Sequence, residues 1–282
     1  MNAPTQNFEA VKLVPARQDG LFVSYAQNLE DVMLNRVFPG DHGFYIDVGA
    51  QHPLTHSTTH AFYKRGWHGI NLEPNREYYS KLKAHRSRDI NLQVAASDHE
   101  GEITFYEIAG TGLSTSVTRY ADQATKSGLH SKKTTVSCST LDEICREHHV
   151  TNVDFLKIDV EGAEEFVLRG FSFKAVRPTV LVIEATEPGT PFPSYQNWEP
   201  YLLTRDYLMA HDDGLNRFYL AKERIDLLDL LEKQPNVFDH YQVHMTPRQI
   251  VHFFATAALD QMPPVVGRSA RALRRALLAA KH

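Results

Sequence analysis

The chain has 282 residues, 42% hydrophobic and 23% charged, which is the composition of an ordinary globular protein. A formal charge of -4 and a pI near 6.4 give no basis for expecting nucleic acid as a partner. The two cysteines, Cys138 and Cys145, are too few for a disulfide framework and predict a reducing, cytoplasmic compartment, and no apolar run approaches the length of a membrane span.

The order of apolar and polar segments predicts three parts. Residues 1–21 have no period and are expected to form a loose leader. Residues 22–221 alternate strands and helices and finish in a hairpin at Asp213-Gly214, which predicts an α/β fold with a doubly wound, Rossmann-like sheet and an antiparallel last strand. Residues 222–282 are expected to form a helical extension. Its basic amphipathic end, 268–281, predicts either peripheral contact with an anionic membrane or a frayed tail.

Individual elements follow from hydrophobic spacing and from capping residues. Helices are predicted at 24–38, 78–85, 198–203, 224–233 and 247–259, and a further helix is predicted after its cap at Ser139. Strands are predicted at 44–50, 67–73, 90–96, 102–107, 134–138, 153–159 and 179–184. Residues 110–133 show no clear period, and an insertion of this length predicts a lid or a substrate loop.

The stretch Phe44–Ala50 is a buried strand that ends in an acid and a glycine. In open α/β sheets ligands bind beyond the carboxyl ends of the strands, so Asp47, Gly49 and Ala50 are predicted to hold a cofactor. A carboxylate there would repel the pyrophosphate of NAD. S-adenosylmethionine has a sulfonium and an ammonium group and no phosphate, so it fits this strand end better.

Other strand ends supply the remaining candidate cofactor contacts. Glu73, followed by Pro74, ends the second strand, where an acid binds ribose hydroxyls. Ser97 and Asp98 follow the third strand and could bond an adenine amino group; a capped turn is the alternative.

Two residues before the first strand are further cofactor candidates. Tyr25 and Gln27 begin the helix predicted at 24–38 and could close over the ligand. The alternative is that this helix simply packs on the sheet.

Five segments together resemble the FkbM-type methyltransferases: Tyr25–Asp31, Phe44–Ala50, Arg65–Pro74, Phe155–Ala163 and Asp213–Tyr219. The resemblance covers about residues 22–221 and implies a class I methyltransferase fold. It also implies S-adenosylmethionine-dependent O-methylation, commonly of hydroxyls on sugars or natural products, with bacterial members in polysaccharide or glycolipid assembly. Many members have Asn-x-Gly where this chain has Gln51-His52-Pro53, so other groups must hold the methionine carboxylate.

A sugar hydroxyl is a poor nucleophile and requires a base or a metal ion. Asp159, Glu161 and Glu184 lie at or just past the ends of two strands that are expected to be neighbours. Either one of them is the base, or Asp159 and Glu184 hold Mg²⁺. Glu161 could instead cap a helix, and Lys157 is expected to pair with Asp159.

Three loop residues are candidates for contact with the acceptor. His52 and His56 follow the first strand, and Ser114 lies in the insertion. Loop histidines are often incidental, and Ser114 could cap a turn.

Two functions of other classes remain open. The chain could be a non-catalytic Rossmann-like module that binds a glycan or a partner, because the altered turn could mean that cofactor binding is lost. An NAD-dependent oxidoreductase would need glycines where Gln51-His52-Pro53 stand. Neither the acceptor hydroxyl nor the oligomeric state is predicted.

Overall fold

A computed structural model of the protein describes residues 21–245. Its main element is a seven-stranded sheet. In spatial order the strands are β10 (Tyr207–Asp212), β11 (Asn216–Ala221), β9 (Val180–Glu184), β8 (Phe155–Ile158), β2 (Phe44–Val48), β3 (His68–Leu72) and β4 (Ile90–Leu92). Neighbours from β9 to β4 pair in parallel, whereas β11 is antiparallel to both β9 and β10. The predicted α/β class is therefore confirmed, and the last strand of this sheet in the chain is antiparallel.

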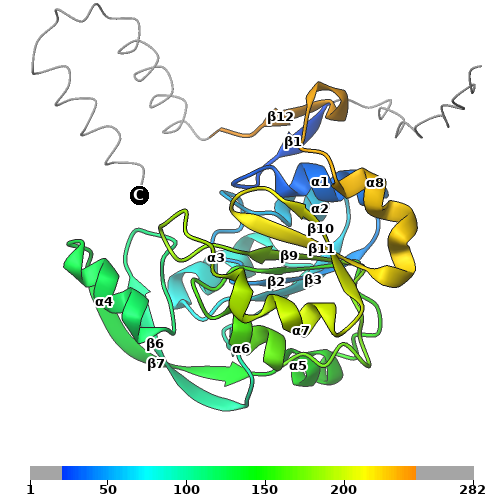
Figure 1. The fold of residues 1–282 in the computed structure, drawn as a ribbon. Coiled ribbons are helices and arrows are strands. Elements are labelled where there is room, and N and C mark those ends of the chain that lie inside the picture. The colour runs from blue at the N-terminus through cyan, green and yellow to red at the C-terminus, as the bar shows by residue number, and fades with distance from the viewer. Residues whose placement is uncertain (1–20, 246–282) are drawn as a thin grey trace, which may run out of the picture.

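Each face of the sheet is covered by helices. Figure 1 shows α1 (Glu30–Val37), α2 (His60–Lys64) and α8 (Leu228–Leu231) on one side and α5 (Leu141–Glu147), α6 (Glu164–Arg169) and α7 (Glu199–Leu203) on the other. The central strands alternate accordingly. Tyr45 packs into the apolar cluster with α1 and α2, whereas Ile46 packs into the one with α5 and α6. Because central parallel strands are buried on both faces, they appear in the sequence as continuous apolar runs.

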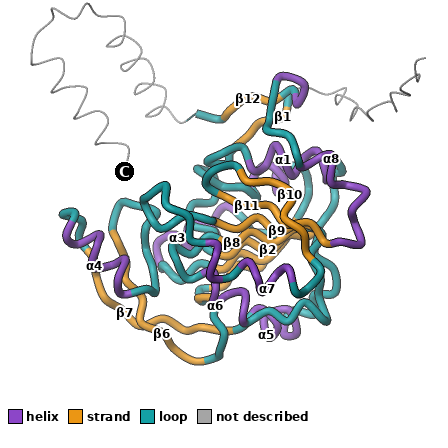
Figure 2. Tube along the Cα trace, viewed as in Figure 1, coloured by secondary structure: helices purple, strands orange, loops and turns teal. Residues whose placement is uncertain are grey.

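A second, three-stranded sheet projects from the main one. It consists of β5 (Ala95–Ala96), β7 (Ser131–Ser139) and β6 (Gly101–Ile108), and it carries α4 (Thr118–Lys126) (Figure 2). The single strand predicted at 90–96 is wrong, because Gln93 and Val94 separate β4 in the main sheet from β5 here. The short strand predicted at 134–138 is longer, since it pairs along the whole of β6. The insertion contains α4, whose helical period was not recognised in the sequence.

Helix boundaries differ from the prediction where side chains cap them. The first helix begins at Glu30, so Tyr25 and Gln27 precede it. The helix α3 (Arg76–His85) begins earlier than predicted because Asn75 accepts hydrogen bonds from the N–H groups of Glu77 and Tyr78. Thr140, and not Ser139, caps α5.

The two ends of the described chain lie together. The strand β1 (Phe22–Ser24) pairs in parallel with β12 (Tyr241–Val243). Before β12, the chain forms 3-10 turns at Lys222–Leu227 and Val237–Asp239 on either side of α8; a third such turn, Tyr195–Asn197, precedes α7. The predicted leader up to residue 20 and the two helices predicted after residue 246 lie outside the described residues.

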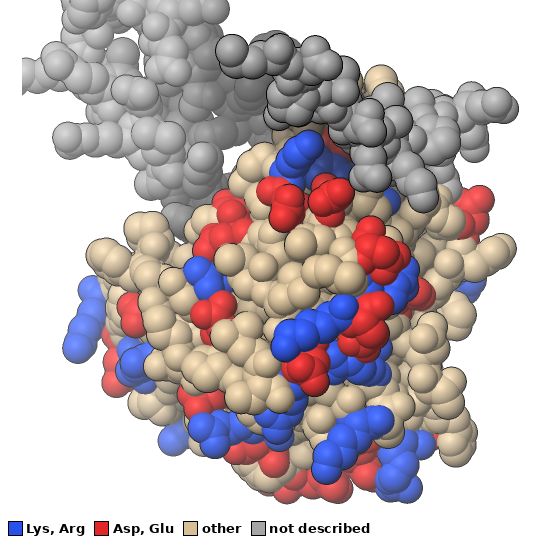
Figure 3. All heavy atoms as spheres, turned by 45° about the vertical axis from the view of Figure 1, so that its right-hand side comes forward, with Lys and Arg blue, Asp and Glu red and all other residues tan. Residues whose placement is uncertain are grey.

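Both signs of charge are interspersed on the surface. On the face drawn in Figure 3, basic and acidic side chains lie next to one another, and this face shows no extended basic patch. None of the helices in residues 21–245 combines the length and the apolar character that a membrane span requires.

Candidate active site at the carboxyl ends of the strands

The first acid lies at the end of the central strand β2. Asp47 is 2% exposed, and its Oδ2 accepts a hydrogen bond of 2.8 Å from the Thr59 hydroxyl. Its Oδ1 is buried and has no hydrogen-bond partner within the described part of the chain. An unpaired buried carboxylate oxygen is costly. Asp47 Oδ1 is therefore a candidate acceptor for a ligand, and the predicted cofactor contact of Asp47 remains a prediction.

The turn after β2 approaches the turn after β8 very closely. Gly49 has φ +77°, and a Cβ at this position would lie 1.8 Å from the backbone oxygen of Asp159. Only glycine fits this conformation and this approach. The close contact holds the Asp47 and Asp159 turns in one fixed arrangement.

The second acid, Glu73, connects two turns. Its carboxylate accepts hydrogen bonds of 2.8 Å from the N–H groups of Gln51 and Asn75. Burial raises the pKa of Glu73 to about 7, although these two bonds oppose the shift. Glu73 thus fixes the position of Gln51, which has a positive φ of 49°. Ala50 and Pro74 lie beside it in the same two turns.

The loop that follows Gln51 is held by an arginine that the sequence analysis did not identify. Arg86 is fully buried and donates to the Pro53 carbonyl from Nε at 3.0 Å and from Nη2 at 2.9 Å. It also donates to the hydroxyls of Ser57 and Tyr45, and Asp89 lies 3.6 Å from its guanidinium. In the sequence Arg86 stands in a polar stretch after a helix, so no local signal marks it as buried.

This loop contains two histidines, His52 and His56, that were predicted to contact the acceptor. His52 is half-buried and its Nδ1 accepts from the N–H groups of Leu54 and Thr55, so it caps its own loop. Burial, followed by the positive charge of Lys81, lowers the pKa of His52. His56 is exposed and has a positive φ of 56°. Contact of either residue with an acceptor remains a prediction.

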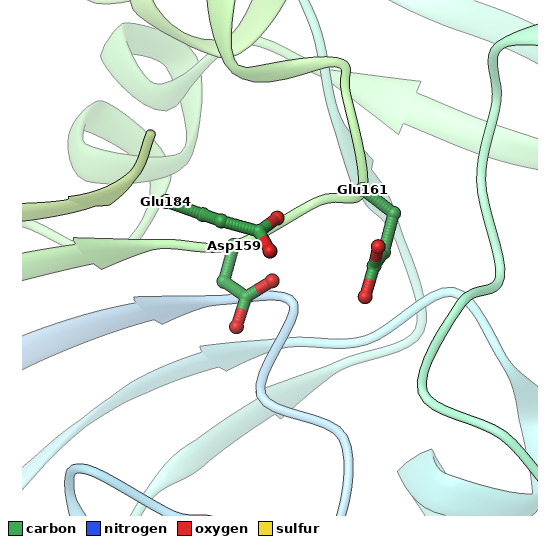
Figure 4. Close-up of side chains that lie close together, drawn as sticks. All are labelled: Asp159, Glu161 and Glu184. Atoms are coloured by element: carbon green, nitrogen blue, oxygen red, sulfur yellow. The ribbon is translucent and has the colours of Figure 1, made fainter. Parts of the chain in front are cut away.

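Three carboxylates gather where β8 and β9 end. These strands are parallel neighbours, as predicted. One oxygen each from Asp159, Glu161 and Glu184 lies within 4.8 Å of the others (Figure 4). Lys157 donates to Asp159 Oδ2 at 2.9 Å, which confirms the predicted ion pair. Burial alone would lower the pKa of Lys157, but Asp159 and Asp47 outweigh it and raise that pKa above its ordinary value.

The cluster is short of positive charge. Burial, followed by repulsion from Asp159, raises the pKa values of both Glu161 and Glu184 well above their ordinary value. Burial also raises the pKa of the adjacent Glu164 to about 7. Glu164 accepts from the N–H groups of Val160 and Gly162, so it performs the capping role that the sequence offered for Glu161.

The insertion lies over this cluster. The Thr115 hydroxyl donates to the Glu161 carbonyl at 2.7 Å, and the ring of Tyr120 on α4 lies against Gly162. Gly112 faces the side chain of Gln51. Ser114, a candidate for substrate contact, accepts from the N–H of Ile108 and so caps a turn. The insertion therefore covers the edge where the candidate catalytic acids lie.

Before α1, the segment with Tyr25 is fixed by buried acids. Asp31 accepts from the Ser24 hydroxyl and the Tyr25 N–H, and Glu30 accepts from Asn216 on β11. The Tyr25 hydroxyl accepts from Lys64. Gln27 is exposed. The segment is thereby attached to the strand that pairs with Glu184.

The two residues predicted to contact adenine, Ser97 and Asp98, lie near the end of α6. The backbone oxygen of Ser97 lies 2.0 Å from where a Cβ of Gly170 would stand, at the end of α6. Asp98 bonds to Ser97 and His99. Their predicted contact with adenine remains a prediction.

A separate groove of about 930 Å³ lies between α3 and the β6–β7 pair and includes Pro74 in its lining.

The fold and this edge of carboxylates are compatible with a methyltransferase-like α/β protein whose candidate site lies at the carboxyl ends of parallel strands. The family model of the methyltransferase FkbM domain matches residues 47–209, more than half of the chain. The protein therefore belongs to the family of FkbM methyltransferase domains, and the resemblance described from the sequence is confirmed. A search of curated proteins finds no match.

Proposed function

We propose that the protein is an S-adenosylmethionine-dependent O-methyltransferase, with its sheet the doubly wound sheet of class I methyltransferases. The acceptor is a hydroxyl, on a sugar in polysaccharide, glycolipid or natural-product assembly. The observation that carries the proposal is the unpaired Oδ1 of Asp47 at the end of β2, within a chain of a methyltransferase family.

The residues at this edge fit the cofactor. Asp47 offers a buried carboxylate to a cationic ligand, and Gly49 and Ala50 follow it in the same turn. Glu73 has lone pairs left after its two backbone bonds, so it accepts from ribose hydroxyls next to Pro74. When bound, S-adenosylmethionine supplies an electrophilic methyl group.

The acids of β8 and β9 would activate the acceptor. A carboxylate of Asp159, Glu161 or Glu184 takes the hydroxyl proton. If Asp159 and Glu184 held Mg²⁺, the ion would lower the pKa of that hydroxyl. Thr115 and Tyr120 fix the insertion over these acids, so it limits access of water. Alignment of the hydroxyl and the methyl group lowers the barrier by at most about 7–11 kcal/mol.

A separate observation argues against each of the two rival functions. An unpaired carboxylate at the end of β2 disfavours a dinucleotide pyrophosphate, which argues against an NAD-dependent oxidoreductase. The match to a methyltransferase family over more than half of the chain argues against a non-catalytic module. Both observations favour methyl transfer.

Calorimetric titration with S-adenosylmethionine and S-adenosylhomocysteine tests the proposal. Asp47→Ala should abolish binding, because the ammonium group loses its carboxylate. Asp47→Asn, which retains an acceptor for Thr59 but no charge, should weaken binding about 10–100-fold, the value of a charge-assisted hydrogen bond. Asp122→Ala, at an exposed acid of α4, is the control. Binding by Asp47→Ala equal to wild type, or binding of NAD in place of both ligands, would overturn the proposal.

A further inference from the structure

The carboxylates of Asp159, Glu161 and Glu184 lie closer together than their own hydrogen bonds and charges explain. We propose that these three side chains together bind one divalent metal ion. The catalytic role of the ion rests on the proposed function, but its binding can be measured without any methyl transfer.

The spacing of the oxygens fits a coordination sphere. One oxygen from each residue lies within 4.8 Å of the other two. Oxygens on opposite sides of Mg²⁺ are about 4.2 Å apart, and those around Ca²⁺ are up to about 5.2 Å apart, since the bonds are roughly 2.1 and 2.6 Å. Figure 4 shows the carboxylates of Asp159 and Glu184 facing each other, with Glu161 across from them. The arrangement already suits the larger ion and needs only small rotations for the smaller.

Two of the three carboxylates have a buried oxygen without a donor in the described residues. The Oε2 atoms of Glu184 and Glu161 are buried, and neither has a hydrogen-bond partner in residues 21–245. Glu184 is only 8% exposed, so water cannot replace the missing donor freely. Asn216, the strand partner of Glu184, donates its side-chain amide to Glu30 instead. Carboxylate oxygens of this kind are the ligands that Mg²⁺ and Ca²⁺ prefer in proteins.

If the carboxyl groups of Asp159, Glu161, Glu164 and Glu184 are all ionised, the described part of the site has an excess of negative charge. Lys157 neutralises Asp159, and Glu164 adds a further carboxyl group beside Glu161 and Glu184. Of these four acids, Asp159 is the one that pairs with the Lys157 ammonium group within the described residues. A divalent cation would bring the cluster close to neutrality, and Asp159 would keep one oxygen for the ion while the other accepts from Lys157.

The backbone holds Glu161 in a conformation that a helix cap does not require. Its φ is +54°, and the Thr115 hydroxyl bonds to its carbonyl. Such left-handed conformations in a non-glycine residue are costly and persist where the surroundings impose them. The turn therefore directs Glu161 toward the other two acids, while Glu164 provides the cap. At this place a divalent ion would lower the pKa of a coordinated acceptor hydroxyl.

The test is a metal titration of the full chain after treatment with a chelator. Calorimetry with Mn²⁺, Mg²⁺ and Ca²⁺, together with the loss of the free Mn²⁺ spin-resonance signal, should show one saturable site. Glu184→Gln, which keeps the side-chain volume, should weaken Mn²⁺ binding about tenfold or more because it removes one charged ligand. Glu161→Gln should do the same, and it serves as the second variant if Glu184→Gln fails to fold.

Glu165→Gln is the matched control, because Glu165 lies in the same motif but pairs with Arg169 at the surface. Its Mn²⁺ affinity should equal that of wild type. A wild-type protein without saturable binding of any of the three ions would overturn the inference. Equal affinities of wild type, Glu184→Gln and Glu161→Gln would also overturn it, since the ion would then bind elsewhere.

A parallel titration with S-adenosylhomocysteine separates this inference from the proposed function. Metal binding without cofactor binding would leave the site standing and remove the proposed methyl transfer. Cofactor binding with methyl transfer but no metal binding would leave the carboxylates as direct bases and refute the metal site.

Discussion

Two buried polar clusters lie on either side of Asp47, and they differ in how completely their charges are paired. In the first, Arg86 is surrounded by the Pro53 carbonyl, two hydroxyls and Asp89. In the second, Asp159, Glu161 and Glu184 face one another with unpaired oxygens. A paired buried cluster gives a fixed conformation, whereas an unpaired one costs stability unless a ligand completes it. The first cluster therefore fixes the loop that follows Gln51, and the second is the candidate for chemistry.

The largest expected effect comes from breaking the paired cluster. Arg86→Met removes the buried cation and leaves Asp89 and the Pro53 carbonyl without it, which should lower the free energy of unfolding by about 3–5 kcal/mol. Urea denaturation measures the change. Arg88→Met, at an exposed arginine that lies over Tyr63, is the control and should cost less than about 1 kcal/mol. Equal midpoints for the two variants would show that Arg86 does not brace the loop.

An intermediate effect is expected at Glu30, a buried acid whose hydrogen-bond donors are amides. Burial raises its pKa from 4.5 to about 7. Because the folded state then binds the proton more tightly than the unfolded state, this group makes stability fall as pH rises from about 4.5 to about 7. Glu73 and Glu164 act with the same sign.

Glu30→Gln should reduce that loss of stability, because the variant cannot ionise. Urea midpoints at pH 5 and pH 8, read for wild type and variant, give the comparison. A variant whose pH dependence equals that of wild type would contradict the assignment, because the two proteins differ only at Glu30.

The smallest effect is expected for an exposed pair in the same motif as the unpaired acids. Arg169 pairs with Glu165 at 2.6 Å, and their side chains are 60% and 35% exposed. Arg169→Ala should change the free energy of unfolding by about 0.5 kcal/mol or less, since surface ion pairs contribute little. A loss comparable to that of Arg86→Met would mean that burial does not distinguish these clusters.

The sequence by itself determined the elements whose pattern is local. Apolar strands ending in Asp47, Glu73 and Glu184 could be recognised because parallel strands are buried on both faces, and the Lys157–Asp159 pair because side chains two residues apart share a face. The family and the position of the candidate site follow from these motifs.

Only the tertiary structure decided what lies next to these strand ends. Arg86 reaches Pro53 across 33 residues, Thr115 bonds Glu161 across 46, and the chain after Leu92 leaves the main sheet for a second one. No local pattern in the sequence predicts these contacts. They arise because buried polar groups must find donors and acceptors wherever folding places them, and that pairing is settled by packing rather than by neighbours in the chain.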